Sequence, residues 1–132
     1  MKTIVFTVLC VAFALGAACG GGKADIDALA TKAADATPSP ALEIRAKGTK
    51  FDKDTLVAPA GAQLVLTFDN QDASVNHNVA VYTNKSAREN LFRGDLFQGK
   101  ETREYRFQAP AAGVYYFRCD VHPDMDGAFI AR

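Results

Sequence analysis

Short runs of β-favouring residues, separated by turn residues, fill the second part of the chain and constrain its fold more than any other feature. Seven such runs occur, at residues 42–46, 55–57, 63–68, 75–82, 102–108, 113–118 and 128–131. Branched and aromatic side chains of this kind fit a half-buried pleated surface, and closely spaced turn signals are typical of a β-sandwich. The sequence therefore predicts one all-β domain over residues 41–132.

One stretch breaks this rhythm. Residues 86–99 form a long connection between two predicted strands. Within this connection, residues 87–92 could form a single helical turn. We therefore allow one short helical turn in an otherwise all-β domain.

The first 18 residues have the three-part layout of an export signal. Lys2 precedes an apolar run at residues 4–15, and small residues at 16–18 come directly before Cys19. The run is shorter than the roughly 20 apolar residues of a transmembrane helix. We expect residues 1–18 to be a cleaved signal peptide, which places the mature protein in the periplasm or at the cell surface. A retained membrane anchor is the alternative.

Cys19 stands where bacterial lipoproteins carry their lipid-modified cysteine, directly after small residues. The match is incomplete, because such sites usually have Leu three residues before the Cys, whereas here Gly16 holds that place and Leu15 lies one further back. Lipidation at Cys19 would anchor the protein to a membrane. Plain release by cleavage is the alternative.

Residues 19–40 differ in composition from both neighbouring parts of the chain. They are rich in Gly, Ala, Asp, Lys and Thr and end with Pro38 and Pro40. A short helix through residues 26–33 is conceivable, but an isolated helix of this length is marginal in water. We expect a flexible tether.

Charge and cysteine content exclude several classes of protein. Fifteen Lys and Arg balance fifteen Asp and Glu, so the chain lacks the basic excess of a nucleic-acid-binding protein. Three cysteines are too few for a fold that depends on disulfides. We expect no nucleic-acid partner.

Three potential metal ligands recur at three-residue intervals near the carboxyl end: Cys119, His122 and Met125. The only other histidine is His77. Sulfur ligands suit copper(I), imidazole suits both copper states, and two His, one Cys and a weak Met define a blue-copper electron-transfer site. The sequence thus predicts one copper ion held by these four residues.

Strand alternation favours a shared direction for the ligands. His77 would lie on one strand face with Val75, Val79 and Val81, and Cys119 would continue the row of Tyr115 and Phe117. Both rows are apolar, so both ligands are expected to face the core. The order of the strands is not determined by this pattern.

The pair His77-Asn78 and residues 115–127, which read YYFRCDVHPDMDG, make the domain similar to the cupredoxins, the small blue-copper family of plastocyanin, amicyanin and azurin. The resemblance covers most of residues 41–132. It implies a Greek-key sandwich with one type-1 copper, His77, Cys119 and His122 as equatorial ligands, and Met125 as the distant axial ligand. It also implies that Asn78 hydrogen-bonds to the loop that contains Cys119 and orients the site without binding the metal.

The same resemblance implies an electron carrier rather than an enzyme. Its partners would be a redox-protein donor and acceptor that dock transiently around the exposed edge of His122. We expect a monomer.

Other functions can be ranked against this one. A structural zinc site is disfavoured, because zinc prefers four firm ligands and Met is a poor zinc ligand. A hydrolase using Cys119 and His122 would need an orienting residue and an oxyanion hole that no motif supplies. The strongest alternative is an extracytoplasmic module that delivers or sequesters copper, although exposed Met-rich or His-rich tracts that would assist release are missing.

Overall fold

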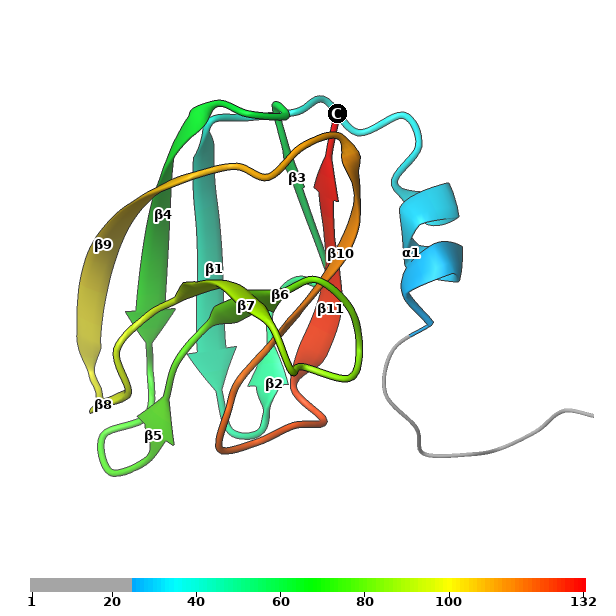
Figure 1. Ribbon diagram of the computed structural model, residues 1–132. Coiled ribbons are helices and arrows are strands. Elements are labelled where there is room, and N and C mark those ends of the chain that lie inside the picture. The colour runs from blue at the N-terminus through cyan, green and yellow to red at the C-terminus, as the bar shows by residue number, and fades with distance from the viewer. Residues whose placement is uncertain (1–24) are drawn as a thin grey trace, which may run out of the picture.

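Two β-sheets face each other in the computed structural model, which describes residues 25–132 (Figure 1). The first sheet contains, in spatial order, β2 (Lys50–Phe51), β1 (Ala41–Lys47), β4 (Gln63–Asn70) and β9 (Glu101–Gln108). The second contains β3 (Thr55–Ala58), β11 (Asp126–Ala131), β10 (Gly113–Arg118), β6 (Ala80–Tyr82) and β7 (Asn90–Arg93). A small separate pair joins β5 (Asn76–His77) to β8 (Phe97–Gln98).

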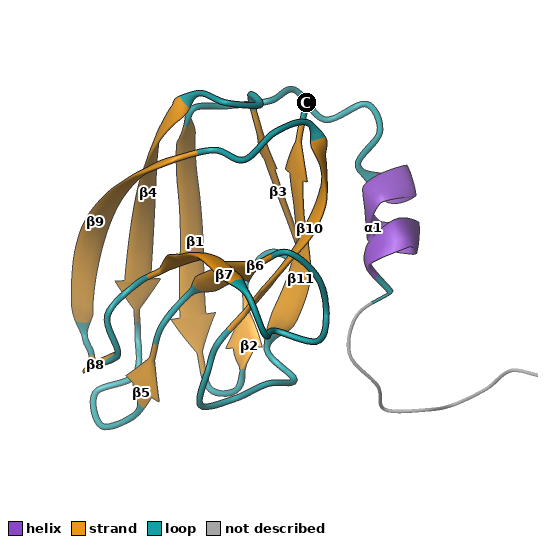
Figure 2. Ribbon diagram, viewed as in Figure 1, coloured by secondary structure: helices purple, strands orange, loops and turns teal. Residues whose placement is uncertain are grey.

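Strands that are far apart in the sequence are neighbours in both sheets. β1 runs parallel to β4, and β3 runs parallel to β11, whereas the remaining pairs are antiparallel. Crossing connections of this kind are a feature of Greek-key sandwiches. The predicted all-β sandwich is confirmed, and strands dominate the described chain (Figure 2).

The core lies between the sheets because the strands of the first sheet alternate. In β1, the side chains of Leu42, Ile44 and Ala46 are buried, and the residues between them are exposed. β4 buries Leu64, Leu66 and Phe68 in the same way. Alternation with a period of two places one face of this sheet on the core and the other in solvent.

Part of the second sheet, above all β11, is buried on both faces, because a helix covers its outer side. Helix α1 (Ile26–Lys32) stands beside β10 and β11 (Figure 1). Its apolar residues, with Ala33, pack on Val57, Ala128 and Ile130. This contact explains why β11 is buried at consecutive positions instead of alternating ones.

Helix α1 is capped at its first turn, and its last turn is bound to the sandwich by polar contacts. The Asp25 side chain caps its first turn by accepting the N–H of Ala28 at 3.2 Å. Lys32 pairs with Asp54 at 3.0 Å, and the Arg132 guanidinium donates to the carbonyl of Ala33 at 3.1 Å. These contacts correct the expectation of a flexible tether over its described part, residues 25–40. Cys19 and the expected signal peptide lie outside the described residues.

The expected helical turn at residues 87–92 is wrong. β7 begins at Asn90 and pairs with β6, and Phe92 stacks on Phe107 with ring centroids 4.1 Å apart. Ala87 has a φ of 52°, which is outside the right-handed helical region. Pairing and aromatic packing therefore override the local helical preference of this stretch.

The strand expected at residues 75–82 is divided into β5 and β6. β5 pairs with β8, whereas β6 lies between β10 and β7. His77, Val79 and Val81 are buried as expected, but Val75 is exposed. The division places His77 at the end of the sandwich, next to the loop that follows β10.

Candidate metal centre

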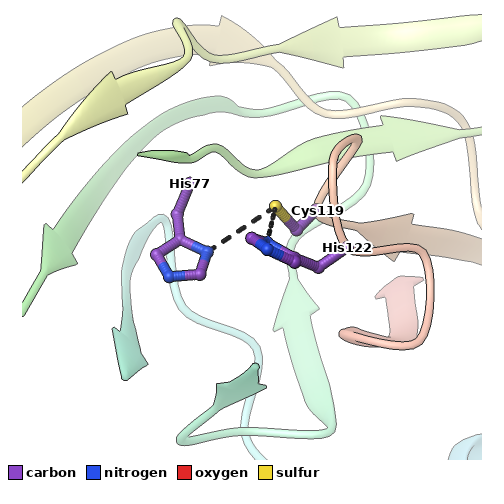
Figure 3. A group of neighbouring side chains, drawn as sticks. All are labelled: His77, Cys119 and His122. Carbon is purple, nitrogen blue, oxygen red and sulfur yellow. Dashed lines mark hydrogen bonds between the residues drawn. The ribbon is translucent and has the colours of Figure 1, made fainter. Parts of the chain in front are cut away.

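Three side chains from two distant parts of the chain meet at this end. His77 closes β5, Cys119 directly follows β10, and His122 lies in the loop that leads to β11 (Figure 3). The Cys119 Sγ lies 3.8 Å from the Nδ1 of His77 and 3.7 Å from the Nδ1 of His122. The structure therefore brings together the first three of the four predicted ligands.

The loop that carries these ligands closes on itself. The backbone N–H of Cys119 donates to the carbonyl of Met125 at 2.9 Å, and the N–H of Met125 donates to the carbonyl of His122 at 2.8 Å. Met125 is buried and belongs to the same apolar cluster as Cys119. A loop this short and internally bonded leaves its side chains little freedom to move.

Burial sets the character of the site. His77 and Cys119 have no exposed surface, whereas His122 is partly exposed. The two imidazole rings lie 4.8 Å apart at an angle of 47°. One histidine therefore faces the interior, and the other connects the site to the surface.

The spacing of the donor atoms fits one metal ion. Bonds of about 2.0 Å to nitrogen and about 2.3 Å to sulfur, the lengths zinc makes with these donors, put N and S roughly 3.7 Å apart at a trigonal angle. The two observed Sγ to Nδ1 distances are 3.8 and 3.7 Å, and all three donor atoms lie within 4.8 Å of one another. Imidazole and thiolate donors with a nearby thioether are the set that copper prefers.

The outer nitrogen of His77 is held by an acidic residue. Its Nε2 lies 2.9 Å from the Oδ2 of Asp72. Metal-binding histidines commonly donate their second ring N–H to a carboxylate, which fixes the ring and its tautomer. Sequence reasoning missed Asp72, because a lone Asp in a turn is a common solvent-facing residue.

Asn78 joins the two halves of the site through hydrogen bonds. Its Oδ1 accepts the backbone N–H of Asp120 at 2.8 Å, and its Nδ2 donates to the Asp120 carboxylate at 3.0 Å and to the carbonyl of Gly94 at 3.2 Å. Asn78 is almost fully buried. It thus ties the residue after His77 to the residue after Cys119.

Asp120 is a second residue that the sequence did not single out. Its carboxylate accepts the Tyr82 hydroxyl at 2.5 Å and lies 3.2 Å from the Nε of Arg93 and 3.4 Å from the Nε of Arg118. Burial alone would raise the pKa of this carboxyl group, but the hydrogen bonds from Tyr82 and Asn78 and the two guanidinium charges outweigh burial and hold the pKa below its ordinary value.

Three exposed apolar side chains flank the site residues along the chain. Val75 lies two residues before His77, Val121 directly precedes His122, and Leu96 precedes the strand partner of His77. Leu96 also lines a surface hollow together with Asn78 and Asp120. Apolar surface is therefore exposed close in the chain to the candidate ligands.

Comparison with known proteins identifies the class. The sequence model of the cupredoxin-like domain family matches residues 8–131, so the chain belongs to that family. The predicted membership is confirmed, and with it the expectation of one type-1 copper as the cofactor.

Individual relatives are auracyanins and amicyanins. Auracyanin-A of Chloroflexus aurantiacus is 28% identical over 160 aligned positions, which cover 100% of this chain and 98% of the relative. Its solved structure, described as a "blue" copper protein, matches with a TM-score of 0.62 at 27% identity, over 73% of this chain and 100% of that one. Amicyanin of Paracoccus versutus matches with a TM-score of 0.53 at 25% identity, over 75% of this chain and 88% of that one.

A further solved structure supports the fold alone. Reduced auracyanin of Roseiflexus castenholzii matches with a TM-score of 0.67 at 19% identity, over 73% of this chain and 99% of that one.

Within residues 25–132, no helix is long and apolar enough to cross a membrane.

Proposed function

We propose that this protein is an exported blue-copper electron carrier in which His77, Cys119, His122 and Met125 hold one copper ion. The observation that carries the proposal is the buried cluster of one thiol and two imidazoles with Sγ to Nδ1 distances of 3.7 and 3.8 Å. When bound, copper supplies a one-electron couple between copper(I) and copper(II).

The protein's own residues make that couple fast and reversible. The bonded loop from Cys119 to Met125 and the link from Asn78 to Asp120 hold the donors in one arrangement. Ligands that stay in place need little reorganisation when an electron arrives or leaves. The buried side chains of His77, Cys119 and Met125 keep water away from the interior side of the site.

Electron exchange with partners would take place at His122. It is the only one of the two site imidazoles that reaches the surface, and Val121 beside it is 46% exposed. An apolar surface of this kind suits brief contact with another redox protein, because it can be desolvated without leaving charges unpaired. A redox donor and acceptor are the partners we propose, and a monomer is the form that would dock with them.

The amino-terminal part completes the proposal. Residues 1–18 would direct export, and Cys19 would carry a lipid that holds the domain at a membrane in the periplasm or at the cell surface. Replacing Cys19 with Ser should then move the protein from the membrane fraction to the soluble fraction. Unchanged fractionation would mean that the protein is anchored in another way or not at all.

Copper delivery or sequestration is the competing function. The chain contains two histidines, both in the cluster, and two methionines, Met1 and Met125. Outside the cluster, Cys and Met occur only at Met1, Cys10 and Cys19, in the expected signal peptide and at the expected lipidation site, so residues 20–132 contain no further Cys or Met to pass a copper ion to a recipient. This count and the burial of the cluster favour electron transfer.

Repeated oxidation and reduction separates the two functions. The copper-loaded protein is cycled with a mild reductant and oxidant in the presence of a copper(I) chelator, and bound copper is measured after each cycle. An electron carrier keeps its copper and recovers its colour each time. Progressive loss of copper to the chelator in the reduced state would favour copper handling.

A further inference from the structure

Asp72 holds His77 from the side opposite the cysteine sulfur. Its Oδ2 lies 2.9 Å from the Nε2 of His77, while the Nδ1 of the same ring faces Cys119. The His77 side chain has no exposed surface, and that of Asp72 is 20% exposed. The ring is therefore held between an acidic oxygen and a sulfur atom, away from bulk water.

Three other segments hold Asp72 in place, one through its side chain and two through its backbone. The N–H of Gly48, in the turn between β1 and β2, donates to the same Oδ2 at 2.6 Å. The backbone N–H of Asp72 donates to the Oδ1 of Asn70 at 3.0 Å, and its carbonyl accepts the N–H of Gly99 at 3.0 Å. Asp72 is thus tied to the end of β4 and to two neighbouring turns.

Asn70 fixes this arrangement further. It is fully buried, and its Nδ2 donates to the carbonyls of Val75 and Phe97 at 3.0 and 2.9 Å. Gly99 packs so closely on Asn70 that a Cβ at position 99 would contact the Asn70 backbone. The loop carrying Asp72 is consequently a rigid support for the His77 ring.

The chemistry of the contact determines the position of the imidazole proton. A neutral imidazole carries one N–H, and a carboxylate can only accept a hydrogen bond. The proton must therefore be on Nε2, which leaves the lone pair of Nδ1 directed toward Cys119. The negative charge behind the ring also makes Nδ1 a stronger electron donor.

His122 has a different environment. Among the described residues, its ring contacts Cys119 and the ring of His77, and no carboxylate is within hydrogen-bond distance of it. The two imidazoles are therefore unequal: one is buried and supported by a charge, and the other lies at the solvent edge.

We propose that Asp72 is a positioning residue that sets the tautomer of His77 and, through its charge, lowers the reduction potential of the site. The proposal rests on the proposed function, because it assumes that Nδ1 of His77 binds copper. A stronger donor favours copper(II) over copper(I), so removing the charge should raise the potential.

Two substitutions separate the tautomer from the charge. Asp72→Asn keeps an oxygen that can accept the Nε2 proton but removes the charge, whereas Asp72→Ala removes both. Asp95→Asn is the matched control, because Asp95 lies in the loop before β8, is 75% exposed, and pairs with Arg103 at 3.6 Å rather than with a ligand. All variants are prepared as the full chain and loaded with copper.

Three measurements are made on each variant. The reduction potential comes from voltammetry, the copper(II) affinity from competition with a chelator, and the ring protonation from nitrogen NMR of the protein before copper is added. Asp72→Asn should raise the potential more than Asp95→Asn does, and Asp72→Ala should weaken copper(II) binding about 10- to 100-fold. The wild-type spectrum should show a proton on Nε2 of His77.

Two results would overturn the inference. Potentials of both Asp72 variants equal to that of Asp95→Asn would show that the charge has no effect. A wild-type His77 ring protonated on Nδ1 would show that the tautomer is set in another way. If Asp72→Ala does not fold, the potential of Asp72→Asn and the wild-type NMR spectrum still test the role of Asp72. Failure of the wild-type protein to form a blue complex would instead refute the proposed function.

Discussion

Asn78 and Asp120 hold each other through two hydrogen bonds, one from the Asp120 backbone N–H to Asn78 Oδ1 at 2.8 Å and one from Asn78 Nδ2 to the Asp120 carboxylate at 3.0 Å. Each residue directly follows a candidate copper ligand, His77 or Cys119. The pair therefore fixes the distance between two strand ends that are 42 residues apart in the chain.

Replacing Asn78 with Ala removes both bonds and leaves the backbone N–H of Asp120 without its partner, whereas the Asp120 carboxylate keeps Tyr82 and Arg93. A buried group that loses its partner costs about 1–3 kcal/mol, so the variant should unfold at a lower urea concentration. Asn84→Ala is the control, because the Asn84 side chain is exposed and, among the described residues, hydrogen-bonds only to Thr83 and Ser86 beside it. Equal stability losses in the two variants would argue against a special role for Asn78.

Replacing Cys119 with Ser should abolish the intense blue absorption, because that colour arises from the bond between thiolate and copper(II). The fold should persist, since serine is close to cysteine in size. Visible absorption of the copper(II)-loaded variant, compared with the wild type at equal protein concentration, checks this. Surviving intense absorption would show that Cys119 is not the thiolate ligand.

Replacing Met125 with Leu should leave copper bound and raise the reduction potential. The thioether is a weak donor that favours copper(II), and leucine fills similar volume in the buried position without donating. Voltammetry and copper analysis of the purified variant test both parts. An unchanged potential would mean that Met125 is not an axial ligand.

The ion pair between Lys32 and Asp54 should make the attachment of α1 depend on pH. The hydrogen bond from Lys32 lowers the pKa of Asp54 below its ordinary value of 3.8. A lowered pKa in the folded state contributes stability above the unfolded pKa, and this contribution is lost as pH falls through the folded pKa. Asp54→Asn should therefore be less stable than wild type at neutral pH, by less than about 1 kcal/mol for so exposed a pair.

Urea unfolding of the two proteins at neutral and at strongly acidic pH tests this dependence. The stability difference should be present at neutral pH and disappear in acid. A difference that is independent of pH would exclude the carboxylate charge as its cause.

Replacing Gly127 with Ala should destabilise the protein by about 1–3 kcal/mol, as overpacking of a filled site does. A Cβ at this position would collide with the carbonyl oxygen of Asp54 and with the ring of Phe117. Gly113→Ala is the control, because the nearest atoms to a Cβ there belong to the Tyr115 side chain, at 3.3 Å. A loss at position 127 no larger than at position 113 would contradict the close approach of β11 to β10.

The local pattern was sufficient to predict most of the strands and the candidate ligand types, because both depend on neighbouring residues, but it did not predict β2, β7 or β8. Runs of β-favouring residues predicted β1 and β4, and the three-residue spacing of Cys119, His122 and Met125 indicated the candidate metal loop. The proximity of His77 to that loop depends on strand order. Pairing of β6 with β10 establishes that order, and local periodicity does not encode it.

The errors arose where tertiary contacts override local preference. Residues 90–93 form β7 because Phe92 packs on Phe107, although their own sequence allows a helical turn. Helix α1 is stable despite its length of seven residues because it buries apolar side chains against Ile130 and its neighbours. Asp72 was missed because its significance depends on the position of the His77 ring, five residues further along the chain.

The most direct test of the account is the visible and electron paramagnetic resonance spectrum of the protein during titration with copper(II). The account predicts an intense blue band that saturates at one copper per chain and bleaches reversibly when a reductant is added. A colourless or weakly bound copper(II) complex, combined with tight binding of copper(I), would contradict it and favour copper handling.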